Sequence, residues 1–188
     1  CGRNTAPAIL LAVLRILQLE KEAVLCVFPA DHVIRDVAVF HDRLRSAISL
    51  ADNGYMVTFG MTPHYPETGY GYIEGGGDLS GGALKAKRFV EKPDLETARR
   101  YLEAGNFFWN SGMFAFRASV ILEEFKRYQP DLLDKMMGID LSGEHFEAAE
   151  YSRLPDISID YAIMERTRKG AVLPSDFGWS DIGSWKSL

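Results

Sequence analysis

A short, uninterrupted apolar run from Ala23 to Phe28 constrains the fold of this chain more than any other feature. Runs of this kind are typical of strands that helices bury on both faces, as in parallel sheets. Segments with the helical spacing of apolar residues flank it, from Ala6 to Glu20 and from Asp36 to Asp52, and a second strand-like run extends from Tyr55 to Met61. This alternation of helix and strand predicts an α/β fold with a doubly wound, mostly parallel sheet.

Beyond Gly60 the pattern changes to glycine-rich turns and short strands. Strand-like segments from Tyr70 to Glu74 and from Leu84 to Val90 flank a glycine-rich stretch, which predicts a small β-hairpin region beside a cleft. Further helices are expected at Leu95 to Ala104, Ser119 to Tyr128, Pro130 to Gly138 and Ser158 to Arg166, and further strands at Ser111 to Phe116 and Ala171 to Pro174. Because neither an internal repeat nor a linker is visible, one domain is predicted over residues 1–188.

The composition argues against two classes of partner. With 188 residues, 47% of them hydrophobic and 25% charged, the chain has the profile of a soluble globular protein. Its formal net charge of −5 argues against binding nucleic acid or an anionic membrane, since both select an excess of Lys and Arg. No apolar stretch approaches the roughly 20 residues of a membrane span, so the cytoplasm is the expected location. Cys26, within the apolar run, is expected to be a buried thiol.

Polar and glycine residues gather in five segments that are expected to come immediately after apolar strands, at the edge where open α/β sheets bind ligands. These segments run from Phe28 to His32, Thr68 to Tyr72, Phe89 to Pro93, Trp109 to Met113 and Gly178 to Trp185. Taken singly, each has an ordinary structural explanation, with Asp31 as a cap, Lys92 as a solvated lysine and Asn110 as a turn residue.

Taken together, the five segments resemble the sugar-nucleotide pyrophosphorylases, and among them the mannose-1-phosphate guanylyltransferases. The strings that carry the resemblance are Gly2 to Ala8, Trp109 to Phe114, Ser158 to Tyr161 and Trp179 to Trp185. The resemblance implies a Rossmann-like, GT-A-like nucleotidyltransferase fold with the hairpin region over the sugar site. It also implies that GTP and mannose 1-phosphate react to give GDP-mannose and pyrophosphate. Attack of a sugar-phosphate oxygen on the α-phosphate needs positioning and charge neutralisation more than covalent catalysis.

The resemblance implies that Asp31 and Asp181 bind a magnesium ion. Two carboxylates together with phosphate oxygens suit Mg²⁺, which prefers hard oxygen ligands. His32 follows Asp31, but the attacking phosphate oxygen is already ionised and needs no general base, so a structural role is expected for this histidine. Trp179 and Trp185 are expected to pack the late loop rather than stack on guanine.

On the sugar side of the site, the resemblance assigns a role to four residues. Lys92 matches the lysine that holds the sugar phosphate, as a point charge suited to a group that must also move. Glu91 and Asn110 match contacts to sugar hydroxyls, and Gly71 would let the backbone approach the hexose.

On the nucleotide side, the resemblance assigns contacts to Arg3, Asn4 and Thr5. They precede or begin the first predicted helix, whose backbone N–H groups and dipole favour an anion. A capping role for Asn4 or Thr5 can coexist with such contacts. The Gly-Gly-x-Gly-x-Arg loop with which the family wraps the triphosphate does not occur in these 188 residues, so the catalytic domain is expected to be incomplete at its amino-terminal end.

Two alternatives remain open from the sequence. One is a sister enzyme such as a glucose-1-phosphate thymidylyltransferase, against which the strings Gly2 to Ala8 and Ser158 to Tyr161 favour the guanylyl-mannose group. The other is a non-catalytic regulatory protein that binds sugar nucleotides. The joint presence of Asp31, Lys92 and Asp181 argues against this second alternative. The oligomeric state is left open, a homodimer included.

Overall fold

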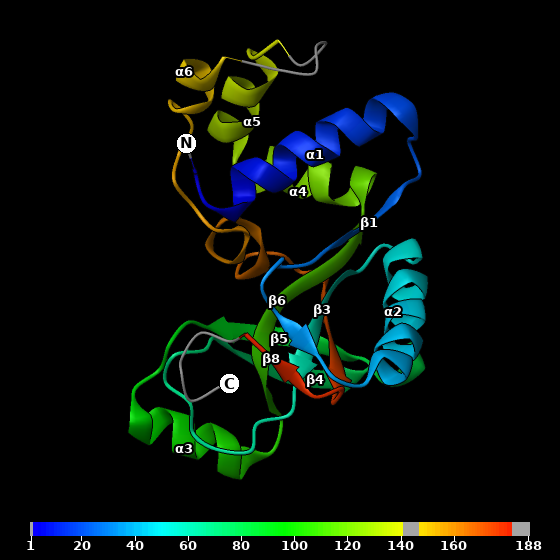
Figure 1. Ribbon diagram of the computed structural model, residues 1–188, viewed down its shortest axis with the longest axis vertical. Helices are drawn as coiled ribbons and strands as arrows, with labels where there is room; N and C mark the ends of the chain where they lie inside the picture. The colour runs from blue at the N-terminus through cyan, green and yellow to red at the C-terminus, as the bar shows by residue number, and fades with distance from the viewer. Residues whose placement is uncertain (1, 141–146, 182–188) are drawn as a thin grey trace. The chain divides into compact units, whose positions relative to one another are not determined.

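The computed structural model describes residues 2–140 and 147–181, and the chain divides into two compact units. The helical unit comprises Cys1–Leu25 and Arg117–Arg168, and the sheet unit comprises Cys26–Phe116 and Lys169–Leu188. Figure 1 shows the course of the chain through both units. This division does not test the single catalytic domain predicted over residues 1–188, which stays a prediction.

The helical unit is built mainly from helices with local sequence signals. They are α1 (Thr5–Leu19), α4 (Ala118–Tyr128), α5 (Pro130–Met137) and α6 (Ala148–Tyr151), followed by a π-helical turn over Asp160–Met164. α1 buries Ile9, Leu10 and Val13, whose spacing places them on one face, and it packs beside α4 and α5 (Figure 1). The helix predicted from Ser158 to Arg166 is shorter than expected, and it is π-helical. The Ser158 hydroxyl accepts the amide of Tyr161 at 3.3 Å, as an N-cap residue would.

The sheet unit contains a six-stranded sheet in the order β1-β6-β3-β7-β5-β4. The strands are β1 (Val24–Val27), β3 (Met56–Met61), β4 (Tyr72–Asp78), β5 (Leu84–Val90), β6 (Phe107–Arg117) and β7 (Gly170–Ser175). A separate ribbon pairs β2 (Val33–Ile34) with β8 (Trp179–Ser180). The unit also contains α2 (Val37–Asp52), α3 (Leu95–Ala104) and a 3-10 turn over Ser80–Gly82.

The predicted α/β fold is confirmed, but the sheet is mixed rather than mostly parallel. β3 pairs parallel with β7, whereas the pairs β3–β6, β4–β5, β4–β6 and β5–β7 are antiparallel. Part of the reason lies in the hairpin of β4 and β5, which the sequence predicts. It joins the main sheet through β6 and β7, and consecutive strands linked by a short turn must run antiparallel.

Two further expectations about strands need correction. The run from Ala23 to Phe28 is expected to be buried on both faces, yet in β1 only Leu25 is buried. β1 stands at the end of the strand order, so Cys26 is half-buried, although burial still raises the pKa of its thiol. β6 begins at Phe107 rather than at Ser111, so the segment from Trp109 to Met113 lies inside a strand instead of following one.

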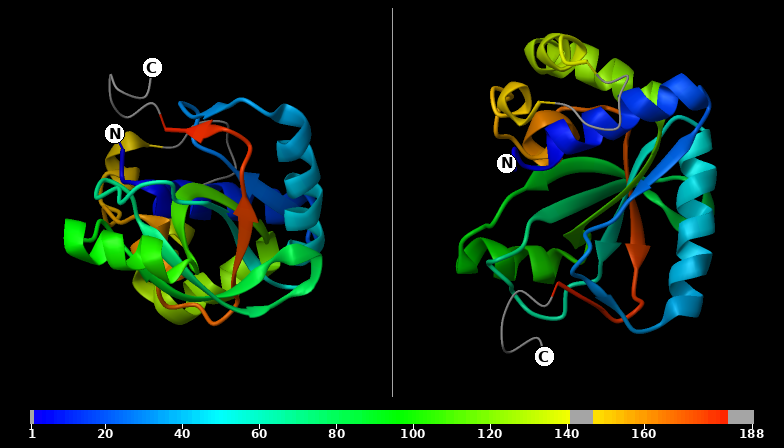
Figure 2. Two further views of the ribbon diagram at one scale, coloured as in Figure 1. Left: turned by 90° about the horizontal axis from the view of Figure 1, so that it is seen from below. Right: turned by 45° about the horizontal axis from the view of Figure 1, so that its top comes forward.

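Capping residues set the start of both α2 and α3 in the sheet unit. The carboxylate of Asp36 accepts the amide of Val39 at 3.0 Å, and that of Asp94 accepts the amide of Thr97 at 2.7 Å. α3 stops at Gly105, whose φ of 71° lies in the left-handed region that favours glycine. Figure 2 shows α2 and α3 on opposite sides of the strands. Within residues 2–140 and 147–181, no helix is long and apolar enough to cross a membrane.

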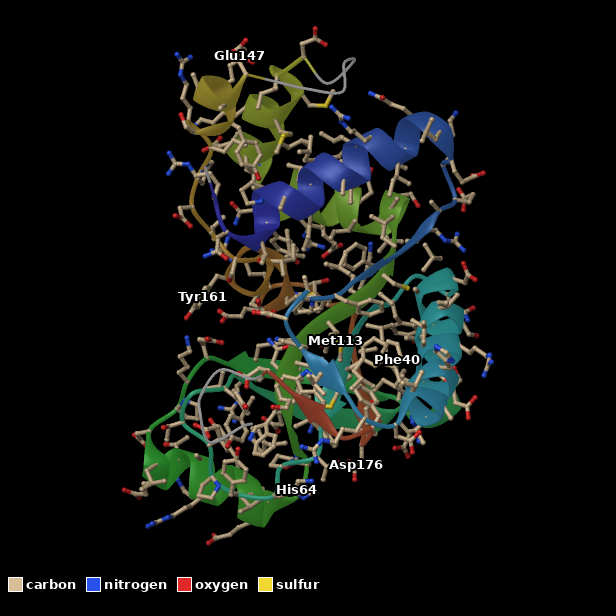
Figure 3. All side chains as sticks on the ribbon, viewed as in Figure 1. Phe40, His64, Met113, Glu147, Tyr161 and Asp176 are labelled. Atoms are coloured by element: carbon tan, nitrogen blue, oxygen red, sulfur yellow. The ribbon has the colours of Figure 1, made fainter. Side chains whose placement is uncertain are left out.

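An aromatic cluster anchors two segments that lead into the candidate site. The ring of Phe40, on α2 (Figure 3), lies 5.6 Å from that of Phe28, 6.2 Å from that of Phe59 and 5.4 Å from that of Phe177. The pairs of Phe40 with Phe28 and Phe177 are edge to face, and such pairs are favourable beyond their buried area. Because Phe28 precedes Asp31 and Phe177 precedes β8, the cluster fixes the starting points of both segments.

Candidate functional site

Three predicted sugar-side residues converge in the sheet unit. The amide of Asn110, in β6, donates to the carbonyl of Gly71 at 2.8 Å, immediately before β4 begins. A Cβ atom added to Gly71 would lie 2.7 Å from Oε2 of Glu91 and 3.5 Å from Cβ of Asn110. The strands β4, β5 and β6 thus bring Gly71, Glu91 and Asn110 together, and a side chain at position 71 would displace the carboxylate of Glu91. We call these three residues the sugar cradle.

Hydrogen bonds orient the side-chain amide of Asn110. Its Oδ1 atom accepts the backbone amide of Gly112 at 3.2 Å and the hydroxyl of Thr58 at 3.4 Å. Gly112 has a φ of 68°, and this left-handed conformation lets its amide turn back toward the side chain of Asn110. An amide with a fixed orientation presents its donor and acceptor in a defined arrangement, as recognition of a sugar hydroxyl requires.

Lys92 lies beside the cradle in an unusual backbone conformation. Its φ is 42°, a region that L-residues other than Asn and Asp rarely adopt. Its Nζ atom lies 3.4 Å from Oε1 of Glu91, and 63% of its side chain is exposed against 30% for Glu91. Strained backbone conformations of this kind cluster at active sites and ligand sites.

The two predicted metal-binding segments meet in the ribbon of β2 and β8. Val33 pairs with Ser180 and Ile34 with Trp179, in antiparallel register. Asp31 precedes β2 by two positions and Asp181 directly follows β8, so the ribbon carries both carboxylates at the same end. The sequence places these residues 150 positions apart, and the strand pairing brings their segments side by side.

Beside the ribbon, Trp179 contacts both His32 and Tyr70. The indole nitrogen of Trp179 donates to Nδ1 of His32 at 3.1 Å, with the rings edge to face. The Trp179 ring also packs at 5.4 Å from that of Tyr70. Trp185, the other aromatic expected in this loop, lies outside the described residues.

The hydroxyl of Tyr70 donates to Oδ1 of Asp181 at 2.9 Å. Burial, together with the hydrogen bond to Asp181 and its charge, raises the pKa of this hydroxyl, so Tyr70 remains a donor. Its ring also packs 5.4 Å from that of Trp109, which Tyr65 and His64 (Figure 3) contact from the same loop. Sequence reasoning placed Tyr70 within a motif without giving it a role, because its partner lies 111 positions away.

The donor set fits the predicted ion. In the described parts of the chain, no group of three or more His, Cys, Asp and Glu residues is arranged to hold a metal. Magnesium does not need such a group, because it keeps several waters and binds through one or two carboxylates plus substrate phosphates. Asp31, which is exposed, and Asp181, which is half-buried, would supply two such carboxylates, and their binding of magnesium stays a prediction.

The nucleotide-side residues lie in the helical unit, where part of their hydrogen-bonding capacity is used. Asn4 caps α1 by accepting the amide of Thr5 at 2.9 Å, and the Thr5 hydroxyl accepts the amide of Ile159 at 2.8 Å. Arg3 donates to the carbonyl of Ser152. These contacts join the strings Gly2 to Ala8 and Ser158 to Tyr161, which the sequence shows only as separate motifs.

The first turn of α1 therefore offers an anion fewer backbone donors than expected. The amide of Thr5 bonds to Asn4, the amide of Ala6 donates to the carbonyl of Ile157 at 3.1 Å, and Pro7 has no N–H group. Nucleotide contacts by Arg3, Asn4 and Thr5 stay a prediction, which now depends on side-chain groups more than on the helix terminus.

Comparisons with known proteins agree with this architecture. The nucleotidyl transferase family matches residues 1–188. The chain is 48% identical over 195 residues to the xanthan biosynthesis protein XanB of Xanthomonas campestris pv. campestris, and 48% over 200 residues to the mannose-1-phosphate guanylyltransferase of Escherichia coli K12. All of this chain is covered in both matches, but only 41% and 42% of the relatives, so the chain spans about two fifths of their length.

A solved structure also matches the whole of this chain. A Thermus thermophilus protein described as a mannose-1-phosphate geranyltransferase matches 100% of this chain and 55% of its own, with a TM-score of 0.90 and 37% identity. The sequence match over the whole chain and the structural match thus agree. The chain belongs to the nucleotidyl transferase family.

Proposed function

We propose that this chain carries out nucleotidyl transfer from GTP to α-D-mannose 1-phosphate, giving GDP-mannose and pyrophosphate. The observation that carries the proposal is the convergence of Gly71, Glu91 and Asn110, with Lys92 adjoining them, in a chain 48% identical to a protein named for this reaction. A polar cradle with a cation at its side is suited to a hexose bearing a single phosphate. We place the reaction in the cytoplasm.

In this proposal the sugar cradle binds and orients the hexose. The backbone at Gly71 allows the sugar ring to approach, the carboxylate of Glu91 accepts from a hydroxyl, and the fixed amide of Asn110 contacts another. Lys92 holds the phosphate of mannose 1-phosphate so that one of its oxygens faces the α-phosphate of GTP. Since that oxygen is already ionised, the residues have to position it and need not remove a proton.

Members of this family generally use a divalent metal ion. Here we propose Mg²⁺, held by Asp31 and Asp181. When bound, the ion would neutralise charge on the phosphate oxygens. The side chains of Arg3, Asn4 and Thr5 are proposed to contact the nucleotide.

The proposal is tested by comparing the rates for each pairing of a nucleoside triphosphate with a sugar phosphate. The protein that carries this chain would be incubated with GTP, dTTP or UTP against mannose 1-phosphate or glucose 1-phosphate, and pyrophosphate release would be measured for each pair. The fastest release is expected with GTP and mannose 1-phosphate. Preference for dTTP and glucose 1-phosphate would instead identify a sister thymidylyltransferase, and tight binding of GDP-mannose without turnover of any pair would identify a regulatory protein.

A further inference from the structure

Tyr70 stands where the sugar cradle meets the ribbon that carries Asp181. Its neighbour Gly71 belongs to the cradle, and the Gly71 carbonyl accepts the amide of Asn110 at 2.8 Å. Its own hydroxyl reaches across to Oδ1 of Asp181 at 2.9 Å. A single residue thus spans the sugar side and the metal side of the candidate site.

The ring of Tyr70 is held from two directions. It lies 5.4 Å from the ring of Trp109 in β6 and 5.4 Å from the ring of Trp179 in β8. Both contacts are edge to face, with interplanar angles of 75° and 64°. A ring packed between two tryptophans keeps its hydroxyl in one place, so the hydrogen bond to Asp181 costs little further side-chain entropy.

The orientation of Asp181 matters because a carboxylate side chain can adopt several rotamers. Asp181 follows β8, and the hydroxyl of Tyr70 favours the rotamers that keep Oδ1 within its reach. Carboxylates that bind metals are commonly held by hydrogen bonds from neighbouring groups, and removing such a partner weakens metal binding by about 10–100-fold.

We propose that Tyr70 is a positioning residue for the metal site, whose hydroxyl fixes the carboxylate of Asp181 and links its orientation to the sugar cradle. The inference rests on the proposed function, in which Asp181 is a magnesium ligand. In this proposal Tyr70 acts through Asp181 and not through a contact of its own with the ion or the reacting phosphates. Loss of its hydroxyl should therefore affect metal affinity more than affinity for mannose 1-phosphate.

The test compares Tyr70→Phe, which removes the hydroxyl and keeps the ring, with Tyr65→Phe as a matched control. Tyr65 lies in the same loop and packs 4.9 Å from the ring of Trp109. Mn²⁺ binding in the presence of GDP-mannose would be measured by electron paramagnetic resonance in the full chain. Tyr70→Phe should bind Mn²⁺ about 10–100-fold more weakly than wild type, while Tyr65→Phe should bind it as wild type does.

Kinetics provide a second readout. In Tyr70→Phe, the Mg²⁺ concentration for half-maximal pyrophosphate release should rise by a similar factor, whereas KM for mannose 1-phosphate at saturating Mg²⁺ should stay within about twofold. Thermal melts identify a misfolded variant. Mn²⁺ affinity is therefore compared at a temperature below the melting transitions of both proteins, so that a lower affinity of Tyr70→Phe reports positioning of Asp181 and not unfolding.

Unchanged Mn²⁺ affinity and Mg²⁺ dependence in a folded Tyr70→Phe would overturn the inference and leave the proposed function intact. A change in KM for mannose 1-phosphate alone would also overturn it, because Tyr70 would then serve the sugar directly. A wild-type protein that binds Mn²⁺ but turns over no sugar phosphate would overturn the proposed function instead. Wild-type protein without any Mn²⁺ binding would overturn both.

Discussion

The indole of Trp179 and the imidazole of His32 are joined by a hydrogen bond of 3.1 Å that spans 147 positions of the sequence. Since Nδ1 of His32 accepts this bond, the neutral histidine carries its proton on Nε2. The contact lies beside the pairing of Ile34 with Trp179 and so reinforces the ribbon of β2 and β8.

Replacing Trp179 by Phe should lower stability modestly. The variant loses the N–H donor to His32 and keeps an aromatic ring against Tyr70, so we expect a decrease of about 0.5–1.5 kcal/mol in the free energy of unfolding. Denaturation in urea measures this difference. The effect should shrink in a His32→Phe background, where the acceptor is already absent, and equal effects in both backgrounds would show that the hydrogen bond contributes nothing.

Removal of divalent metal should abolish activity. Asp31 and Asp181 are carboxylates at one end of a ribbon, and the proposed reaction brings polyphosphate charge to them. Pyrophosphate release from GTP and mannose 1-phosphate would be followed with and without excess EDTA, then after Mg²⁺ is restored. Full activity in excess chelator would eliminate the metal assignment.

Lys92→Ala should weaken the binding of mannose 1-phosphate much more than the binding of GTP. If the lysine loses water on binding the sugar phosphate, the transition state should lose about 2–4 kcal/mol, seen as a lower kcat/KM for mannose 1-phosphate. Lys85→Ala provides the control, since Lys85 is an exposed lysine of β5 away from the cradle. Equal losses for both substrates would point to a general structural role of Lys92.

Gly71→Ala should damage the sugar cradle without unfolding the chain. The added methyl would stand 2.7 Å from Oε2 of Glu91, so the carboxylate would have to move. We expect KM for mannose 1-phosphate to rise by at least about tenfold, roughly 1.4 kcal/mol, with little change for GTP. The matched control is Gly77→Ala in the same strand, β4, where an added Cβ meets nothing within 4 Å. Similar kinetics for both variants would contradict the cradle.

The cap of α3 should contribute stability that depends on pH. The amide of Thr97 donates to the carboxylate of Asp94 and lowers its pKa below the ordinary value of 3.8. The contribution of the charged cap is therefore complete above pH 3.8 and is lost as pH falls through the lower pKa of the folded state. The urea midpoints of wild type and Asp94→Ala should differ at neutral pH and converge in acid, and a constant difference would argue against a charged cap.

The helices α2 and α3 could be predicted from the sequence because their determinants are local. Asp94 and Gly105 mark the two ends of α3, and Asp36 marks the start of α2, through contacts made within a few residues of each. The candidate residues beside strands were also identified from the sequence, since polar groups next to apolar runs signal ligand-binding edges.

The tertiary structure decided which strands pair and which side chains meet. Strand partners depend on contacts between distant segments, so sequence periodicity could not show that the sheet is mixed, that β1 is half-exposed or that Asn110 lies inside β6. The same holds for the approach of Tyr70 to Asp181. That hydrogen bond exists only because the packing of β4, β6 and β8 places two tryptophans around one tyrosine ring, and no local pattern encodes it.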